Sequence, residues 1–454
     1  MPYKMHYDSD KRLIISDISC QCGCVHNSPS QDIYVGNGIL DNIASYIDKR
    51  DWGKKCVLVA DNITYDVAGG RASALLTAAG YNVSECVLKR EGRLEPDETA
   101  VGEVFLALMP DTAFIVSVGS GSITDTARVV ASKVGLPQVC VGTAASMDGY
   151  TSSICPLTYR GVKIHRPGKC PEIIVCDIDV IKTAPMNMVA SGVGDVLGKY
   201  IAKADWKIGR IINDEVYCDV CGEIVTDALE RLLDNIDEIK SRSDAGIKLL
   251  VEALLLSGMT IMIIGHTRAV ASVEHNIAHY WEMMQMFRGR PAPGHGASVG
   301  VSTRLVWPVF KRFEGEKLSK INLDAARKSL MSREERVKWM NYAYGPAAQS
   351  IMDENEGDFL SLSEQERRIA RAQARAEEIR QVIAEMPPVS LIEDAMRRLG
   401  APMTPEELGV DDNLLNLSMH CAKDYRTRYT LFKLISEMGL EDKYLADYPL
   451  NRRD

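Results

Sequence analysis

Short apolar runs alternate with helical stretches from about residue 33 to about residue 180, and this alternation limits the fold more than any other feature of the chain. The pattern predicts strands at 55–60, 83–88, 113–118, 138–141 and 173–176. Amphipathic stretches at 39–47, 70–79 and 100–108 precede or separate them. Because strands that alternate with helices form parallel sheets, the sequence predicts an N-terminal α/β domain with a parallel sheet.

The strand signal fades after about Pro185, and the rest of the chain is predicted to be helical. Stretches at 186–208, 214–241, 246–264 and 269–287 carry apolar residues three and four apart, often on more than one face, as in helices that pack inside a bundle. A chain of 454 residues suits two or three domains. We therefore expect an α/β domain at 1–185 and an all-helical domain at 186–454.

Charge and hydropathy exclude several classes of protein. A net charge of −9 gives no overall positive field that would attract nucleic acid or an anionic membrane. The chain has no uninterrupted apolar run of membrane-spanning length, and its first residues lack the apolar core of a secretion signal. We expect a cytoplasmic protein that binds a small molecule, not nucleic acid or a membrane, and forms a homodimer or larger homo-oligomer.

The twelve cysteines are spread over a long chain without an export signal, which favours reduced thiols. Two clusters stand out: Cys20, Cys22 and Cys24 with His26, and Cys218 with Cys221. The first has the residue types of a metal site but not the spacing of a common zinc module, so a structural metal there is the less favoured alternative. The second lies in a helical segment, outside the strand-turn-helix setting of a redox motif. Buried or incidental thiols are the favoured interpretation of both.

A glycine-rich turn, Gly119-Ser120-Gly121-Ser122, follows the strand that ends at Val118 and opens the helical pattern at 123–132. Such a turn exposes backbone N–H groups at a helix N-terminus, where hydrogen bonds and the helix dipole stabilise a phosphate. The alternative is a plain turn. The strand before it and the helix after it favour a phosphate site and a Rossmann-like, dinucleotide-binding sheet.

Asp61 directly follows the apolar strand V-L-V-A. A carboxylate there can accept both ribose hydroxyls of an adenosine and repel a 2′-phosphate, which would favour NAD over NADP. The alternative is that Asp61 only begins the turn D-N-I-T. The segment 141–153 (V-G-T-A-A-S-M-D-G-Y-T-S-S) offers small and hydroxyl side chains for ligand approach, with Asp148 as its one carboxylate. Asp148 could orient a substrate hydroxyl or hydrogen-bond its own turn. The candidate cofactor residues are Asp61, Gly119, Ser120, Gly121, Ser122, Asp125, Thr143, Ser146 and Ser152.

Asp195 lies inside an apolar, small-residue helix, where a carboxylate needs a partner. Lys199, one turn on, could pair with it, or a metal could be shared with His275 and His295. From spacing alone the histidines could equally be core residues. His275 and His279 are four residues apart, and the pattern H-x-x-x-H recurs in ordinary amphipathic helices. One carboxylate with two imidazoles suits Zn²⁺, Fe²⁺ or Ni²⁺, and such a metal acts as a Lewis acid on a carbonyl or alkoxide. A nicotinamide beside it would imply a dehydrogenase.

Several motifs agree in order and spacing with one family: G-S-G-S-I-T-D-T-A-R, T-A-A-S-M-D-G-Y-T-S-S, V-I-K-T-A-P, A-S-G-V-G-D-V-L-G-K-Y, E-H-N-I-A-H-Y-W-E and G-H-G-A-S-V-G-V. From about Asp32 to the R-T-R-Y-T-L-F of 426–432, the chain resembles the sn-glycerol-1-phosphate dehydrogenases, most closely their bacterial, arabinose-operon-associated branch. These belong to the superfamily of iron-containing alcohol dehydrogenases, glycerol dehydrogenases and dehydroquinate synthases. The resemblance implies the architecture of glycerol dehydrogenases and dehydroquinate synthases. It also implies an NAD(P)-linked reduction of dihydroxyacetone phosphate to sn-glycerol 1-phosphate.

The resemblance also implies roles for single residues. Asp195, His275 and His295 correspond to the metal ligands, with Zn²⁺ expected ahead of Ni²⁺ or Fe²⁺, Asp148 faces the substrate, and His279 is a neighbour of the metal site. The candidate catalytic residues are Asp148, His279 and Lys199. For the substrate phosphate the candidates are Arg268, Lys163 and Arg166, each of which could instead be a surface charge. Arg128 replaces a lysine usual in the wider superfamily but agrees with this branch.

Three alternatives stay open: a cyclase or lyase of the dehydroquinate-synthase kind with transient NAD use, a polyol dehydrogenase acting on a non-phosphorylated substrate, and a non-catalytic metal- or nucleotide-binding protein. The charged segment 363–385 is predicted to be a solvated surface helix. That segment and the cysteine-rich N-terminus are less familiar in the family and leave open a changed substrate or assembly.

Overall fold

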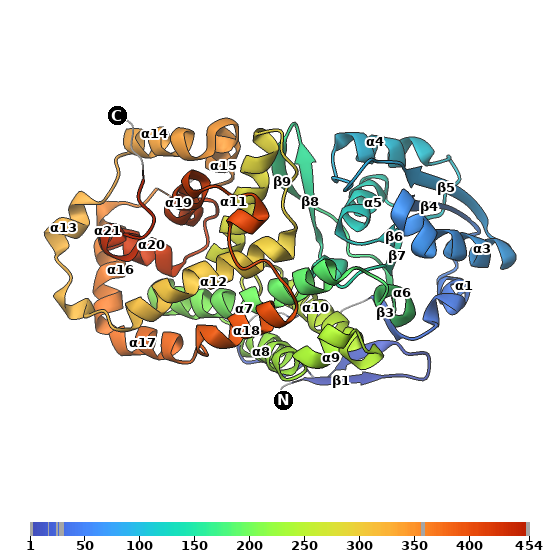
Figure 1. Cartoon of the computed structure of the whole chain (residues 1–454), viewed down its shortest axis with the longest axis horizontal. Coiled ribbons are helices and arrows are strands. Elements are labelled where there is room, and N and C mark those ends of the chain that lie inside the picture. Colours follow the sequence, from blue (N-terminus) through green and yellow to red (C-terminus); the bar gives the residue numbers. More distant parts are fainter. Residues whose placement is uncertain (1–2, 17, 24–25, 27–30, 356–358, 451–454) are drawn as a thin grey trace. The chain divides into compact units, whose positions relative to one another are not determined.

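The structure is a computed structural model that describes residues 3–16, 18–23, 26, 31–355 and 359–450. It divides into two compact units (Figure 1): unit 1 comprises Met1–Val196, Cys218–His266 and Arg398–Gly400, and unit 2 comprises Leu197–Tyr217, Thr267–Arg397 and Ala401–Asp454. Helix α7 (Met186–Asn213) begins in unit 1 and continues into unit 2. The domain boundary predicted at residue 185 stays a prediction.

Unit 1 contains a six-stranded sheet of parallel strands in the order β3-β10-β7-β6-β4-β5. The strands are β3 (Asp32–Gly36), β4 (Lys55–Asp61), β5 (Asn82–Leu88), β6 (Phe114–Gly119), β7 (Gln138–Gly142) and β10 (Ile173–Asp177). The predicted α/β class with a parallel sheet is confirmed. Strand β3, a short edge strand, was not among the strands predicted from the sequence.

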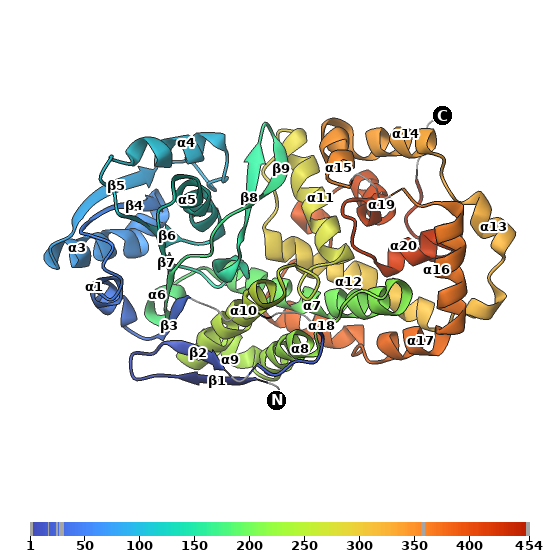
Figure 2. The ribbon, with the colours of Figure 1, turned by 180° about the vertical axis from the view of Figure 1, so that it is seen from behind.

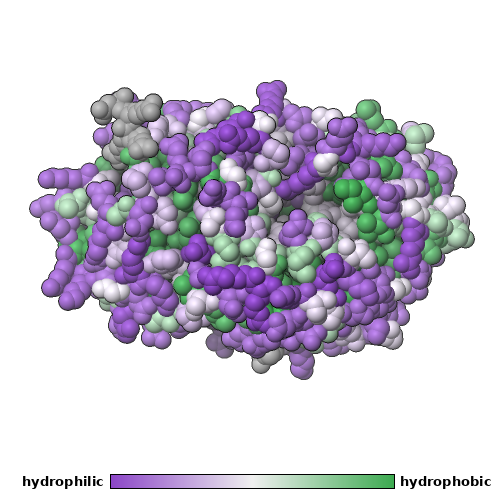
Figure 3. Space-filling view, viewed as in Figure 1, coloured by the Kyte–Doolittle hydropathy of each residue, from purple (hydrophilic) through white to green (hydrophobic). Residues whose placement is uncertain are grey.

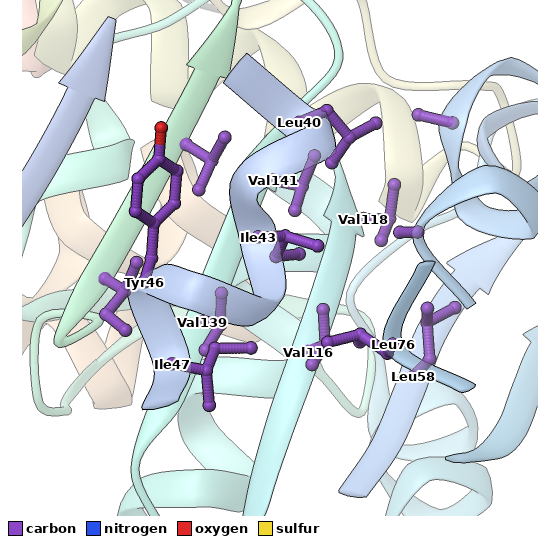
Figure 4. Packing of buried hydrophobic residues seen from close by; sticks show 14 of the residues in the cluster. Leu40, Ile43, Tyr46, Ile47, Leu58, Leu76, Val116, Val118, Val139 and Val141 are labelled. Carbon is purple, nitrogen blue, oxygen red and sulfur yellow. The ribbon is translucent and has the colours of Figure 1, made fainter. Parts of the chain in front are cut away.

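The central strands are buried on both faces, which explains their nearly continuous apolar runs. On one face, η1 (Ile39–Asn42) and α1 (Ile43–Asp48) pack Leu40, Ile43 and Ile47 against strand residues that include Val116 and Val139 (Figure 4). Helix α3 (Gly70–Ala78) covers the same face. The opposite face is covered by α4 (Glu98–Ala107) and α5 (Gly121–Val134).

The strand order reverses beside β4. From β4 the chain passes through α2 (Asn62–Thr64) and α3 to β5 on one side, and then through α4 to β6 on the other side of β4. In open parallel sheets, ligands bind in the crevice at the carboxyl ends of the strands at such a switch point. Asp61 ends β4 and Gly119 ends β6, so two predicted cofactor residues lie at this point.

A hairpin replaces the loop predicted around Lys163 and Arg166. Strands β8 (Ile154–Tyr159) and β9 (Val162–Pro167) pair antiparallel, with Thr158 opposite Lys163. The loop prediction was wrong because G-V-K-I-H-R-P carries few apolar residues. Ile164 is buried and packs with β8 against α5, which helps to fix the register.

A second hairpin, β1 (Lys4–Tyr7) and β2 (Leu13–Ser16), lies beside the helices α8 (Asp219–Asp234), α9 (Ile236–Ser241) and α10 (Asp244–Ile264) of unit 1 (Figure 2). The Tyr3 hydroxyl donates to Asp227 on α8 at 2.9 Å, and the Tyr7 hydroxyl donates to Glu252 on α10 at 2.6 Å. These bonds join the N-terminal hairpin to α8 and α10.

Unit 2 is helical in its described residues. After the second half of α7 its helices are α11 (Val273–Phe287), α12 (His295–Glu314), α13 (Leu323–Lys328), α14 (Arg333–Tyr344), α15 (Ala348–Glu354), α16 (Leu362–Ala374), α17 (Ala376–Ala384), α18 (Val389–Arg398), α19 (Asp412–Cys421), α20 (Leu431–Glu437) and α21 (Glu441–Tyr444). The charged segment forms two helices, α16 and α17. Each buries one apolar face, with Ile369 on the first and Ile379 on the second, and exposes ion pairs such as Arg380–Glu377.

Helix α10 is the one helix in the described residues that is long and apolar enough to cross a membrane, but 78% of its most apolar window is buried within the protein. That burial is typical of a core helix. The face of the molecule in Figure 3 is largely hydrophilic, with hydrophobic residues in scattered groups.

Candidate active site

The glycine-rich turn has the strand-turn-helix geometry that the sequence predicts. Gly119 is the last residue of β6, Ser120 is the N-cap of α5, and Gly121 begins the helix. A Cβ on Gly119 would lie 2.5 Å from the Cβ of Ile123, so only glycine allows the strand to turn this tightly into α5. The Ser120 hydroxyl lies 2.8 Å from the Ser146 hydroxyl, which joins the N-terminus of α5 to the segment after β7.

Asp61 has the local role that the alternative interpretation gave it. Its Oδ1 accepts a hydrogen bond from the Thr64 N–H at 2.7 Å, and the Asp61 N–H donates to the Thr64 hydroxyl at 3.0 Å. This capping box begins α2. The carboxylate nevertheless lies at the end of β4, where the switch point provides a ligand crevice, so a cap and a ribose contact are compatible.

Arg128 is a residue whose role the sequence analysis did not find. Its side chain is fully buried and donates to Asp125 Oδ1 at 2.8 Å, to the Gly149 carbonyl at 2.7 Å and to the Ile154 carbonyl at 3.1 Å. The bonds anchor the loop between β7 and β8 to α5. Asp125, predicted to contact the cofactor, is the ion-pair partner of this arginine.

Asp148 and Asp195 are joined within unit 1. The main-chain N–H of Asp148 donates to Asp195 Oδ2 at 3.0 Å, and Asp148 Oδ2 accepts a bond from the Ser257 hydroxyl on α10 at 2.7 Å. Ser257 was missed, although a lone serine in the apolar run L-L-L-S-G-M was a usable signal. At Gly258, a Cβ would lie 2.4 Å from the Asp148 carbonyl oxygen, so α10 needs glycine to approach this loop.

The remaining predicted cofactor residues have local roles around the same loop. The Thr143 N–H donates to the Gly119 carbonyl at 3.2 Å, and the Ser152 hydroxyl accepts a bond from the Ile154 N–H at 3.0 Å. Ser122, in the first turn of α5, contributes its carbonyl to the Thr126 hydroxyl at 2.7 Å. These bonds fix the shape of the backbone at the strand ends and leave the contact with a cofactor as a prediction.

Three histidines of unit 2 lie together. His275 and His279 belong to α11, and His295 is the first residue of α12. The ring centroid of His295 lies 5.4 Å from that of His275 and 5.1 Å from that of His279. Helices α11 and α12 therefore bring the imidazoles predicted from the sequence into one group.

Buried carboxylates support two of these rings. His275 Nδ1 lies 2.7 Å from Glu274 Oε1, and His295 Nδ1 lies 2.9 Å from Glu282 Oε1. Both glutamates are at most 1% exposed. A carboxylate on Nδ1 fixes the tautomer and leaves Nε2 as the nitrogen lone pair for a metal, the usual arrangement around metal-bound histidines. Neither glutamate was predicted, although both lie in the same E-H-N-I-A-H-Y-W-E motif.

The predicted basic residues differ in their surroundings. Arg268 is 8% exposed, donates to the carbonyls of Tyr429 at 2.9 Å and Asp205 at 3.2 Å, and pairs with Glu215 at 2.7 Å. Protein groups thus account for much of its hydrogen-bonding capacity, which argues for a structural role. Lys199 is buried in α7, whereas Lys163 on β9 is half-buried.

Arg428 is a further cation of unit 2 that the sequence analysis did not single out. It is half-buried and donates to the Thr267 hydroxyl at 3.0 Å. Burial, followed by the positive charges of Arg268 and Arg426, lowers the pKa of Arg428 to about 10. A pKa lowered by neighbouring cations marks a place where a bound anion would be stabilised.

Several solved structures share this fold. The chain matches glycerol dehydrogenase from Schizosaccharomyces pombe with a TM-score of 0.58 and 18% identity, over 93% of this chain and 91% of that one. It matches sulfoacetaldehyde reductase from Bifidobacterium kashiwanohense, solved in complex with NAD+, with a TM-score of 0.60 and 16% identity, over 94% and 100%. The fold is thus that of the glycerol dehydrogenase and iron-containing alcohol dehydrogenase group, as predicted.

Sequence comparison narrows the class. Residues 34–185 match the family described as iron-containing alcohol dehydrogenase. The chain is 34% identical to glycerol-1-phosphate dehydrogenase (NAD(P)+) of Halalkalibacterium halodurans, over 66% of this chain and 75% of that one. It is 28% identical to the Bacillus licheniformis enzyme of the same name, over 95% of both. The chain is an NAD(P)-dependent oxidoreductase of the alcohol dehydrogenase type. It belongs to the family of the glycerol-1-phosphate dehydrogenases.

Proposed function

We propose that this protein uses NAD(P)H and one divalent metal ion to reduce dihydroxyacetone phosphate to sn-glycerol 1-phosphate. The observation that carries the proposal is the pair of carboxylate-supported imidazoles, His275 and His295, in a chain whose relatives are glycerol-1-phosphate dehydrogenases. The reaction consumes one NADH or NADPH and one proton for each ketone reduced.

The proposed metal ligands are Asp195, His275 and His295. The direction in which Asp195 projects from α7 supports its inclusion among the metal ligands. Gly198 packs so closely against α11 that a Cβ on it would lie 3.4 Å from His275 Cε1. Asp195 precedes Gly198 by three residues and so shares its face of α7. A buried carboxylate on the face that meets His275 would be stabilised by a cation.

A second ligand set deserves comparison, because ligand atoms of His279, Glu282 and His295 lie within 4.8 Å of one another. Glu282 is the carboxylate that supports His295 Nδ1, and a group in that role is not free to ligate through the same oxygen. His279 is therefore proposed as a neighbour of the metal. Its ring lies beside His295, where it could pass a proton to the substrate oxygen.

When bound, a metal at these residues would polarise the substrate carbonyl and stabilise the alkoxide oxygen. Asp148 is proposed to orient a substrate hydroxyl, because Ser257 holds its carboxylate in one direction. Lys199, buried one turn after Asp195 on α7, is proposed to adjust the charge around that carboxylate. The metal is proposed to be Zn²⁺ ahead of Ni²⁺ or Fe²⁺, since one carboxylate and two imidazoles suit all three.

The cofactor is proposed to bind at the switch point of the sheet, with its phosphates at the Gly119–Ser122 turn. Asp61 at the end of β4 favours NAD over NADP because a carboxylate there repels a 2′-phosphate. Asp61→Ser should improve the use of NADPH relative to NADH. An unchanged preference would remove Asp61 from the proposal.

The substrate phosphate needs a cationic partner. Lys163, Arg268 and Arg428 are the candidates, and the partners of Arg268 make Arg428 the better choice in unit 2. Arg428→Gln should raise the KM for dihydroxyacetone phosphate and leave the KM for NADH unchanged. The same change in Lys163→Gln alone would assign the phosphate to β9. We also propose that the protein is cytoplasmic and forms a homo-oligomer. Size-exclusion chromatography with light scattering would test the oligomeric state.

The decisive experiment is a product assay with dihydroxyacetone phosphate and NADH or NADPH after metal reconstitution, with the product enantiomer identified. We expect stoichiometric oxidation of the nicotinamide and sn-glycerol 1-phosphate as product. His275→Ala and His295→Ala should lose the metal ion proposed at Asp195, His275 and His295, together with activity, whereas the control His279→Ala should keep that ion. Metal loss only in the His279 variant would overturn the ligand assignment. Turnover without net NADH oxidation would instead indicate a cyclase or lyase.

A further inference from the structure

Four side chains of metal-ligand type lie together in unit 1. They are Cys20, Cys22 and His26 of the N-terminal segment and Cys218 at the start of α8, and their ligand atoms all lie within 4.8 Å of one another. Two of the three cysteines are contributed by the segment that follows β2, and the third comes from almost two hundred residues later. Cys24, the remaining cysteine of the predicted cluster, lies outside the described residues.

The separations match the edges of a coordination tetrahedron. Cys20 Sγ lies 3.5 Å from Cys218 Sγ, and His26 Nε2 lies 3.4 Å from Cys22 Sγ and 3.6 Å from Cys218 Sγ. Zinc binds thiolate sulfur at about 2.3 Å and imidazole nitrogen at about 2.0–2.1 Å, so tetrahedral angles put the sulfurs roughly 3.8 Å apart and sulfur roughly 3.6 Å from nitrogen. All three measured edges lie within a few tenths of an ångström of these values.

A disulfide explains the arrangement less well. Its sulfurs would be bonded at about 2.05 Å, well inside the separation of Cys20 and Cys218. It would also use two groups and leave Cys22 and His26 without a reason to converge on them. The eleven cysteines that the structure describes are all thiols.

Cys218 is placed to carry a negative charge. It is the N-cap of α8, and its Sγ accepts a hydrogen bond from the Cys221 N–H at 3.4 Å. A thiolate at a helix N-terminus is stabilised by the dipole, and thiolate is the form that binds metal.

We propose that Cys20, Cys22, His26 and Cys218 bind a structural Zn²⁺ ion that fastens the N-terminal segment to α8. Four protein ligands fill a tetrahedral site and leave no position for substrate, so the role is structural. The ion would close a chain loop between residues 198 positions apart and act with the bonds of Tyr3 and Tyr7 to α8 and α10. From the sequence, incidental thiols were the favoured interpretation and a structural metal was the less favoured one. The proposed site corresponds to the structural metal, with Cys218 in place of Cys24.

The test measures zinc per chain in the full-length protein, purified under reducing conditions. His275→Ala removes the proposed catalytic ligand set, so this variant isolates the new site and should hold one zinc per chain. Adding Cys22→Ser or Cys218→Ser should reduce that to none, whereas the matched control Cys86→Ser, a thiol on β5 outside the cluster, should leave it at one. Because the readout is metal content without turnover, failure here is distinct from failure of the proposed dehydrogenase.

Cobalt substitution provides a second measurement that does not depend on cysteine variants folding. Co²⁺ bound by the His275→Ala protein should give the intense thiolate-to-metal absorption and the visible bands of a tetrahedral centre, and one equivalent of Zn²⁺ should abolish them. Absence of metal from His275→Ala, zinc retained in Cys22→Ser, or a Cys20–Cys218 disulfide in the metal-free protein would each overturn the proposal.

Discussion

Replacing Arg128 by methionine should destabilise unit 1 strongly. The guanidinium is fully buried, and its loss leaves Asp125, whose side chain is 11% exposed, as an uncompensated carboxylate. It also removes the hydrogen bonds to the carbonyls of Gly149 and Ile154. Removing one partner of a buried ion pair costs about 3–5 kcal/mol. For a folding unit of this size, that corresponds to a fall in Tm of roughly 6–20 °C.

The assay is differential scanning calorimetry of the full chain, with Arg71→Met as the matched control. Arg71 pairs with Asp41 at 2.6 Å, but both side chains are about half exposed, at 45% and 56%, so the same chemical change should lower Tm by less than about 4 °C. The double variant Asp125→Ala, Arg128→Met should recover part of the loss because no buried charge remains unpaired. If Arg128→Met melts like the control, the buried pair does not stabilise the protein as argued.

Three further predictions concern single positions. Glu282→Gln removes the negative charge beside His295 Nδ1 and should raise the dissociation constant of the catalytic metal about 10–100-fold in a chelator competition. An unchanged constant would contradict the supporting role of Glu282. Gly192→Ala puts a Cβ 2.0 Å from the Ala145 carbonyl oxygen and should cost about 1–3 kcal/mol, seen as a lower Tm; an unchanged Tm would contradict the close packing argued for this position. Burial raises the pKa of Asp205 from 3.8 to about 7, so its contribution to stability is complete below pH 3.8 and is lost as the pH rises toward 7, at about 1.4 kcal/mol per unit. Asp205→Asn should therefore flatten the fall in stability between about pH 4 and 7, and parallel curves for the two proteins would rule out this titration.

The sequence predicted those parts of the fold that depend on local pattern. The buried strands β4, β6, β7 and β10 could be predicted because burial on both faces demands nearly continuous apolar runs. The strand-turn-helix at Gly119 followed from its neighbours in sequence. Strand β9 was mistaken for a loop because its short sequence, V-K-I-H-R-P, mixes few apolar residues with charged ones and so gives too little periodic signal.

Partnerships between distant segments could not be predicted in the same way. The bond from Ser257 to Asp148 spans 109 positions, and nothing local to either residue specifies the other. Cys218 joins Cys20 across 198 positions, so the spacing rules for zinc modules, which assume nearby ligands, pointed away from the cluster. Glu282 is different, because it lies three residues after His279 and was within reach of a helical-spacing argument.

Asp195 and Gly198 lie on one helix, so the number of residues between them determines the direction of the Asp195 carboxylate around the helix axis. Each residue of an α-helix advances the side-chain direction by about 100°, so one residue inserted between these two would swing Asp195 to another side of α7. Substitutions along the helix can change its packing gradually. Each inserted or deleted residue instead rotates the side chains beyond it by about 100°. Chains of this kind should therefore tolerate insertions and deletions in the loops of unit 1 far better than within the three positions that separate Asp195 from Gly198.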